Sequence, residues 1–286
     1  MNTIIDRERL KNNFLKRIEL RSCYEGATEL EMEGIISSVK DCLKSSGYQK
    51  FVSKIASYAD LYNDDEMEDS VSEYEVSEDP VKLYEFSYAD QRINMKICRY
   101  YASLYIDTEE YVNVLDYADG ILKVMQIIKE RIPFASFLSC YIRKINILRL
   151  KNIKKLNSYF NESYFNVLNF PSNQNADSFR AKDSFYNRDG CNYSIERSFI
   201  RGILPNGDSC YEVKMNSLAK SYVQDIDISS NPVLNIIKNI NEQLFHIYTE
   251  SLTDSFIEKL CNAEFCDEDI EGVVKNESAR NKREVV

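Results

Sequence analysis

The stretch Phe134–Lys155, FASFLSCYIRKINILRLKNIKK, decides how this chain folds. Apolar and polar residues alternate through its middle, which is typical of a β-strand with two different faces, and positive charge accumulates at its end. A similar arrangement, FLKRIELRS, occurs at Phe14–Ser22, where a basic pair also precedes alternating apolar and polar residues. We interpret Phe134–Lys155 as the central strand of the protein and as the start of a second structural repeat.

The elements before this strand can be predicted from local signals. Phe14–Cys23 alternates like a strand, and Thr28 follows as the N-cap of a helix, with Glu31 three residues later as its capping-box partner. Residues 81–106 contain two or three strands, and residues 110–131 form a long amphipathic helix with an apolar stripe.

The elements after the central strand repeat this order in outline. Strands are predicted between residues 185 and 228, and Ser230-Asn231-Pro232 begins a second long helix at 233–260, with proline at its first position. The predicted fold class is therefore α+β. It consists of tandem β-α-β(3-4)-α repeats whose curved antiparallel sheets pack on two long helices. This order of elements is also that of the TATA-box-binding saddle, a likeness of topology alone.

The chain divides into three parts in this interpretation. Residues 1–133 form an N-terminal α+β repeat, and residues 134–262 form a C-terminal α+β repeat packed against it. Residues 263–286 begin acidic, end basic and lack an apolar stripe, so they are predicted to be a mobile tail.

Composition argues against several functional classes. The formal net charge is -10, which repels nucleic acids and anionic membranes in general. No stretch approaches ~18 consecutive apolar residues, and the N-terminal residues lack an apolar segment of the kind found in signal peptides. The eight cysteines include no CxxC pair and are expected to be reduced thiols in the core. These features predict a cytoplasmic protein without membrane association, and no cofactor is expected.

The strongest functional signal is positive charge at the end of the central strand. Seven Lys or Arg residues and no acidic residue lie between Arg131 and Asn161. We call Arg143, Lys144, Arg149, Lys151, Lys154 and Lys155 the basic strip. One interpretation is a solvated strand end followed by an exposed helix face. The alternative is a binding surface for an anion or an acidic partner, with Tyr159 and Phe160 available for stacking.

Two acidic features raise the question of metal binding. Residues 60–79 contain ten carboxylates and no Lys or Arg. We interpret them as a solvated loop, because the glycine and the terminal glutamate of an EF-hand calcium loop are missing. Asp225 and Asp227 lie on one face of a predicted strand, about 7 Å apart, as a divalent metal site would require. No third ligand lies nearby in the sequence, so a polar strand end before a helix is the preferred interpretation.

The order of motifs resembles that of a known family. The segments YEFSYADQRINMKI, YIDTEEY, YIRKINIL, YVQDIDI and LFHIYTESLTDSFIEKL follow one another in the same order as in a sporadically distributed, functionally uncharacterised bacterial family of about this length. The resemblance covers roughly residues 14–260. It implies that Arg143, Asp225 with Asp227, and His246 are recurring positions, and it implies no catalytic residues. The chain departs from the family at Arg143-Lys144-Ile145, where the family has an arginine-tyrosine pair.

These observations favour a non-enzymatic binding protein. Catalysis by a nucleophile would need a serine or cysteine beside His246, the single histidine, and no sequence pattern indicates such a pair. The expected function is recognition of a protein partner or a small anionic ligand in the bacterial cytosol, in a stress, immunity or phage-defence setting. The alternative is a nucleic-acid-binding module that uses residues 143–155.

Overall fold

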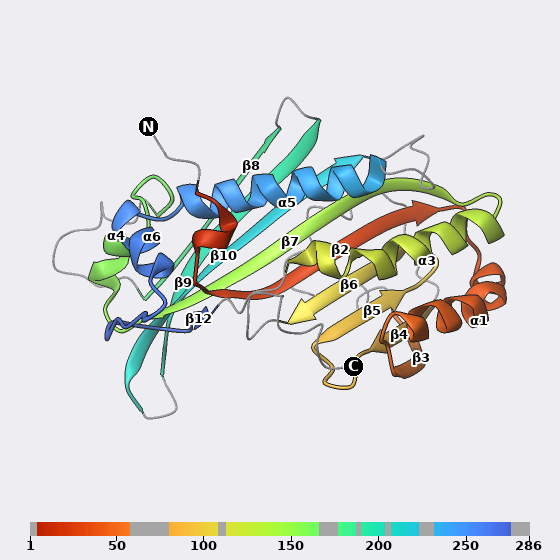
Figure 1. Ribbon diagram of the computed structural model, residues 1–286, viewed down its shortest axis with the longest axis horizontal. Coiled ribbons are helices and arrows are strands. Elements are labelled where there is room, and N and C mark those ends of the chain that lie inside the picture. Colours follow the sequence, from red (N-terminus) through yellow and green to blue (C-terminus); the bar gives the residue numbers. More distant parts are fainter. Residues whose placement is uncertain are drawn as a thin grey trace.

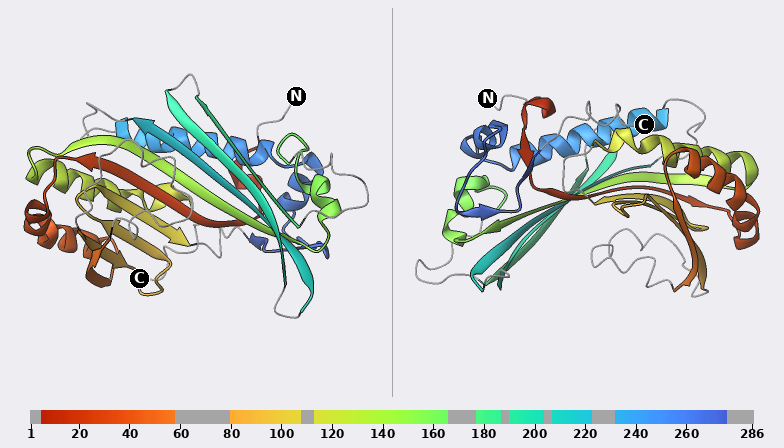
Figure 2. Two further views of the ribbon diagram at one scale, coloured as in Figure 1. Left: turned by 180° about the vertical axis from the view of Figure 1, so that it is seen from behind. Right: turned by 60° about the horizontal axis from the view of Figure 1, so that its bottom comes forward.

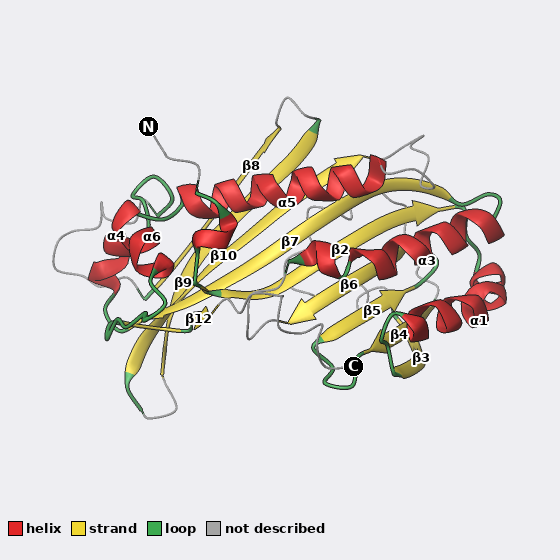
Figure 3. Ribbon diagram, viewed as in Figure 1, coloured by secondary structure: helices red, strands yellow, loops and turns green. Residues whose placement is uncertain are grey.

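A ten-stranded antiparallel sheet forms the body of the protein (Figures 1 and 3). The computed structural model describes residues 5–57, 80–107, 113–165, 177–186, 190–203, 207–222 and 232–275. The strands lie in the order β3-β4-β5-β6-β2-β7-β10-β9-β8, and β11 adds to β7. Their bounds are β2 (Leu15–Glu25), β3 (Lys50–Ala56), β4 (Val81–Ser87), β5 (Ile93–Ile97), β6 (Tyr101–Asp107), β7 (Ser136–Leu150), β8 (Ser178–Tyr186), β9 (Cys191–Ile203), β10 (Ser209–Tyr222) and β11 (Ile270–Glu271).

The predicted central strand is β7, and its main partner within the first half of the chain is β2. The two strands pair antiparallel over most of the length of β2. Beyond this pair, β2 is followed by β6, β5, β4 and β3, whereas β7 is followed by β10, β9 and β8. Each half therefore places its first strand at the centre of the sheet and its last strand beside it.

The predicted fold class is wrong in its layering. We expected separate curved sheets, each packed on one long helix, but the strands form a single continuous sheet. The physical reason is the β2–β7 ladder. An unpaired strand edge exposes a row of backbone donors and acceptors, and pairing the first strands of the two halves satisfies both edges at once.

Three helices cover one face of this sheet. They are α1 (Glu29–Ser45), α3 (Ala118–Arg131) and α5 (Pro232–Glu250), and the right-hand view of Figure 2 shows the sheet arching away from them. The helices bury their apolar stripes against the sheet in one large core. We call this the helix-covered face and the other side the open face. The predicted capping box is confirmed, since Thr28 and Glu31 bond reciprocally at the start of α1.

Both predicted long helices are shorter than expected. The first one comprises a 3₁₀ turn, η2 (Val114–Asp116), followed by α3, and the second one is divided into α5 and α6 (Asp254–Cys261). The break has a clear cause. Leu252 forms a β-bridge with Phe160, and the backbone N–H of Thr253 donates to the carbonyl of Tyr159. The side chain of Thr253 then caps α6.

The short segments near Tyr159 and the C-terminal residues pack at one end of the sheet. Chain reversal after β7 uses η3 (Ile153–Lys155) and α4 (Leu156–Tyr159). In the segment predicted to be a mobile tail, β11 pairs with β7, and β12 (Val274–Lys275) pairs with β1 (Asn12–Asn13). The described part of that segment is thus joined to the rest of the fold, and residues 276–286 lie outside the described residues.

Two further sequence predictions can be compared with the structure. All eight cysteines are free, and four of them are buried, as expected for core thiols. Within the described ranges, no helix is both long and apolar enough to cross a membrane.

Candidate functional site

A cluster of buried polar side chains occupies the centre of the open face. Glu19 lies on β2 directly opposite Tyr105 of β6 on one side and Arg143 of β7 on the other. Arg21, two residues along β2, lies opposite Tyr141. Residues directly opposite one another in an antiparallel pair project from the same face, so three neighbouring strands bring these side chains together.

Glu19 is the common partner within this cluster. Its Oε1 atom accepts hydrogen bonds from the Arg21 guanidinium at 2.9 Å and from the Tyr141 hydroxyl at 2.9 Å. The Arg143 guanidinium lies 3.6 Å from its Oε2 atom. Arg21 also donates to the Tyr105 hydroxyl at 2.7 Å, and its guanidinium lies 4.1 Å from the centre of the Tyr101 ring. Two arginines and one carboxylate are therefore held in fixed positions.

The electrostatics of the cluster follow from burial and charge. Burial alone would raise the pKa of Glu19, but the nearby Arg21 and Arg143 guanidiniums outweigh it and hold this pKa below its ordinary value. Burial raises the pKa of the Tyr141 hydroxyl well above its ordinary value. At neutral pH the cluster therefore contains a carboxylate, two guanidiniums and a neutral tyrosine, with an excess of positive charge.

Basic side chains outnumber acidic ones across the whole described part of the open face. The strand registers place the following charged residues there: Arg17, Arg21, Lys50, Lys54, Lys96, Arg143, Arg149, Arg180, Lys182, Lys214 and Lys220 are basic, and Glu19, Glu25, Glu85, Asp107, Glu196, Glu212 and Glu271 are acidic. Several of the acids are held in ion pairs with these bases, including Arg17–Asp107 at 2.6 Å and Lys54–Glu85 at 3.0 Å. The described side chains of this face carry a net positive charge, whereas the chain as a whole carries a net charge of -10.

The structure does not bring the basic strip together. Arg143 and Lys144 are both buried, and because they are consecutive in a strand they project from opposite faces of the sheet. Arg143 joins the open-face cluster, whereas Lys144 reaches the backbone carbonyl of Asn241 in α5 at 3.5 Å. A continuous positive surface through residues 143–155 is therefore absent.

The rest of the strip is divided between ion pairs and solvent. Arg149 pairs with Glu212 at 3.3 Å, and Lys155 pairs with Asp269. Lys151 and Lys154 are exposed. The predicted stacking residues, Tyr159 and Phe160, are buried in the core, with 3% and 1% of their surfaces exposed. They cannot stack on a ligand at the surface.

Of the positions implied by the family resemblance, the two that the structure describes lie on opposite faces of the sheet. Arg143 lies on the open face, and the half-buried His246 lies on α5, on the other side of the sheet. Asp225 and Asp227 fall outside the described residues, as does the acidic stretch 60–79. In the parts of the chain that the structure describes, no group of three or more His, Cys, Asp or Glu side chains could hold a metal ion.

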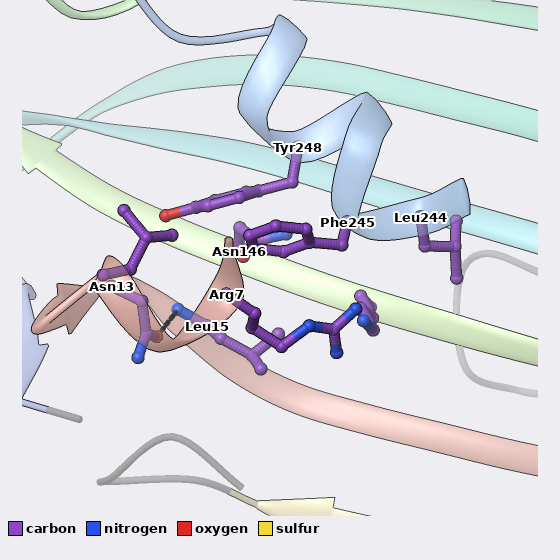
Figure 4. A pocket seen from close by; sticks show the side chains of 9 residues that line it. Arg7, Asn13, Leu15, Asn146, Leu244, Phe245 and Tyr248 are labelled. Atoms are coloured by element: carbon purple, nitrogen blue, oxygen red, sulfur yellow. Dashed lines mark hydrogen bonds between the residues drawn. The ribbon is translucent and has the colours of Figure 1, made fainter. Parts of the chain in front are cut away.

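A small cavity forms a second feature, on the helix-covered face. It lies between α5 and the strands β2 and β7, and its lining includes Arg7, Asn146 and Phe245 (Figure 4). Lys144 also lines it. Its volume is about 30 Å³. That is room for one water molecule or an ion of similar size.

Sequence reasoning missed the acidic centre of the cluster. The motif FLKRIELRS was recognised only as a copy of the central strand, although it contains both Glu19 and Arg21. One signal was present. Charged residues that alternate with Ile and Leu in a strand at the centre of a sheet must be buried on one face, and buried charges require partners.

No protein-family model matches the chain, and no curated protein matches it either. The resemblance to a bacterial family therefore stays a prediction.

Proposed function

We propose that the protein is a non-enzymatic binding protein that takes an acidic segment of a protein partner on the open face of its sheet. The observation that carries this proposal is the excess of basic side chains on that face in a chain of net charge -10. Charge complementarity of this kind steers an acidic partner to one face and excludes approach to the others. The bacterial setting in stress or phage defence stays a prediction.

An acidic polypeptide fits this face better than a nucleic acid does. Glu85, Glu196 and Glu212 lie among the basic residues, and they would repel a continuous row of phosphates. Aromatic side chains usually provide stacking surfaces for exposed bases. Here Tyr101 and Tyr141 are each only 2% exposed. The exposed tyrosines of this face, Tyr186 and Tyr222, are the last residues of β8 and β10, so among the described residues no row of aromatic rings crosses the centre of the face.

The test compares two double charge reversals of equal size. Lys182→Glu/Lys214→Glu changes the open face on β8 and β10, and Lys129→Glu/Lys238→Glu changes exposed lysines on α3 and α5 as the matched control. We would measure fluorescence anisotropy of a labelled poly-glutamate peptide at near-physiological salt. We expect binding to the wild type, weakening of at least about tenfold in the open-face variant and an unchanged Kd in the control.

Three results would contradict the proposal. Equal weakening in both variants would show that overall charge, not the open face, governs binding. Absence of peptide binding to the wild type would exclude an acidic partner. Tighter binding of random-sequence RNA or duplex DNA than of the peptide, with a salt slope that the open-face variant reduces, would favour the nucleic-acid alternative.

A further inference from the structure

The cavity on the helix-covered face contains a buried lysine with few acceptors. Lys144 projects from β7 beneath α5 and is 7% exposed. A protonated amine has three N–H donors. Within the described residues, the Lys144 amine donates a hydrogen bond to the backbone carbonyl oxygen of Asn241, over a long distance of 3.5 Å. The apolar side chains of Leu15 and Leu244 line the same cavity.

A second cation reaches the same oxygen atom. Arg7, which belongs to the 3₁₀ turn η1 (Arg7–Arg9), donates to the Asn241 carbonyl at 3.1 Å and to the Glu242 carboxylate at 3.2 Å. Its guanidinium also lies 4.5 Å from the centre of the Phe245 ring. Glu242 is largely exposed, with 56% of its side chain accessible, so it screens the two positive groups only weakly.

We propose that this cavity is a binding site for a small monovalent anion, of the size class of a halide or formate, held between Lys144 and Arg7. The volume of about 30 Å³ has room for a small ion of this size. An anion supplies the acceptors that a protonated lysine amine needs, and it offsets the positive charge of the neighbouring Arg7 guanidinium. The side-chain amide of Asn146, which also lines the cavity, can donate to the same ion.

Binding at this site is coupled to protonation of Lys144. Burial, followed by the charge of Arg7, lowers the pKa of the Lys144 amine well below its ordinary value, and Glu242 partly opposes this shift. A bound anion favours the charged amine, so anion binding takes up a proton. The affinity for the anion therefore decreases as the pH rises. The charged and titratable groups that surround the amine are Arg7 from η1, and Glu242 and Tyr248 from α5.

A direct test uses bromide as the anion. Crystals of the full chain soaked in sodium bromide should show an anomalous peak inside the cavity, within contact distance of the Lys144 amine. Density with no anomalous signal at that position would show that water occupies the cavity, and it would overturn the proposal.

A solution test separates this site from a general salt effect. At constant ionic strength, replacing gluconate by bromide or formate should raise the melting temperature of the wild type in a saturable manner. Lys144→Met should abolish the increase, and Lys238→Met, which removes an exposed lysine from α5, should retain it. Equal responses in all three proteins would mean a non-specific salt effect. The site lies on the opposite face from the proposed partner surface, so the two proposals fail independently.

Discussion

At the residue scale, Glu19 supplies the carboxylate that faces two buried arginines at the centre of the sheet. Its carboxylate interacts with Arg21 and Arg143, and the side chains of all three residues are at most 3% exposed. Desolvation makes such groups expensive to bury, and the pair interaction offsets that cost only while the carboxylate is present and ionised. We therefore expect a larger energetic role for Glu19 than for a typical exposed ion pair.

Glu19→Gln should destabilise the protein by roughly 3–5 kcal/mol, because it leaves two buried guanidiniums without this carboxylate. Urea unfolding at pH 7 would measure the loss. The control is Glu85→Gln, which removes a partly exposed pair with Lys54 and should cost less than about 1 kcal/mol. A Glu19→Gln protein as stable as the wild type would show that the cluster contributes nothing to folding.

The same residue predicts sensitivity to acid. The pKa of Glu19 is lower in the folded protein than the value of ~4.3 expected in the unfolded chain. The unfolded chain therefore binds a proton first as the pH falls. The stability contributed by Glu19 is fully present above the pKa of Glu19 in the unfolded chain. It is lost as the pH falls through the lower pKa of Glu19 in the folded protein. The acid branch of the stability curve should be shallower in Glu19→Gln than in the wild type.

Lys144 should have the opposite effect on stability. Its pKa is lowered by burial and by Arg7, so burying its amine costs free energy at neutral pH, and Lys144→Met should stabilise the protein by on the order of 1 kcal/mol. Between the folded pKa and the unfolded value of ~10.4, the unfolded chain binds more protons, so wild-type stability rises with pH. The advantage of Lys144→Met, measured by urea unfolding in gluconate buffer, should shrink towards pH 10. A constant difference would contradict this explanation.

At the scale of elements, Asp267 attaches the C-terminal segment to the short helices α4 and α6 at the end of the sheet. It accepts hydrogen bonds from the Tyr159 hydroxyl at 3.2 Å and from the Lys259 amine at 2.8 Å. Its side chain is only 6% exposed. The contact holds the end of α6 beside α4 and positions β11 against β7.

Asp267→Asn should loosen this attachment without unfolding the sheet, because it removes the ion pair with Lys259 and offers the Tyr159 hydroxyl an amide oxygen in place of a carboxylate. Hydrogen exchange of the amides in β11 and β12 should accelerate, while the amides of β2 and β7 keep their protection. Glu264→Gln, an exposed change in the same segment, is the control. Equal acceleration throughout the sheet would show that the segment is part of one cooperative unit with the core.

At the scale of the whole molecule, the β2–β7 ladder joins the two halves of the chain. Each half contributes one of its own inner strands to this ladder, from Leu15–Glu25 and from Ser136–Asn146. Neither half can complete its sheet alone. The predicted division at residue 133 lies between β2 and β7 in the chain, and these two strands pair across it.

The fragments 1–133 and 134–286 should each aggregate when produced alone, because each exposes the long edge of a central strand. Produced together, they should assemble into a soluble complex, which size-exclusion chromatography and circular dichroism would detect. Calorimetry of the intact chain should show one transition. A soluble fragment 1–133 that unfolds cooperatively would contradict this dependence.

Local sequence patterns determined the type and order of most elements. The alternation in Phe134–Lys155 predicted β7, the Thr28 capping box predicted α1, and Pro232 marked the first residue of α5. These signals act over a few residues, through backbone hydrogen bonding and the burial of a periodic apolar face. They are present in the sequence before any tertiary contact forms.

The tertiary structure alone decided the layering and the site. Pairing of β2 with β7 places Tyr141 beside Glu19, 122 positions earlier, and the strand register sends Arg143 and Lys144 to opposite faces. The predicted basic strip was a cluster in sequence but not in space. Local periodicity specifies which residues share the face of one strand, whereas the neighbours of that strand depend on backbone pairing between distant segments, which no local pattern records.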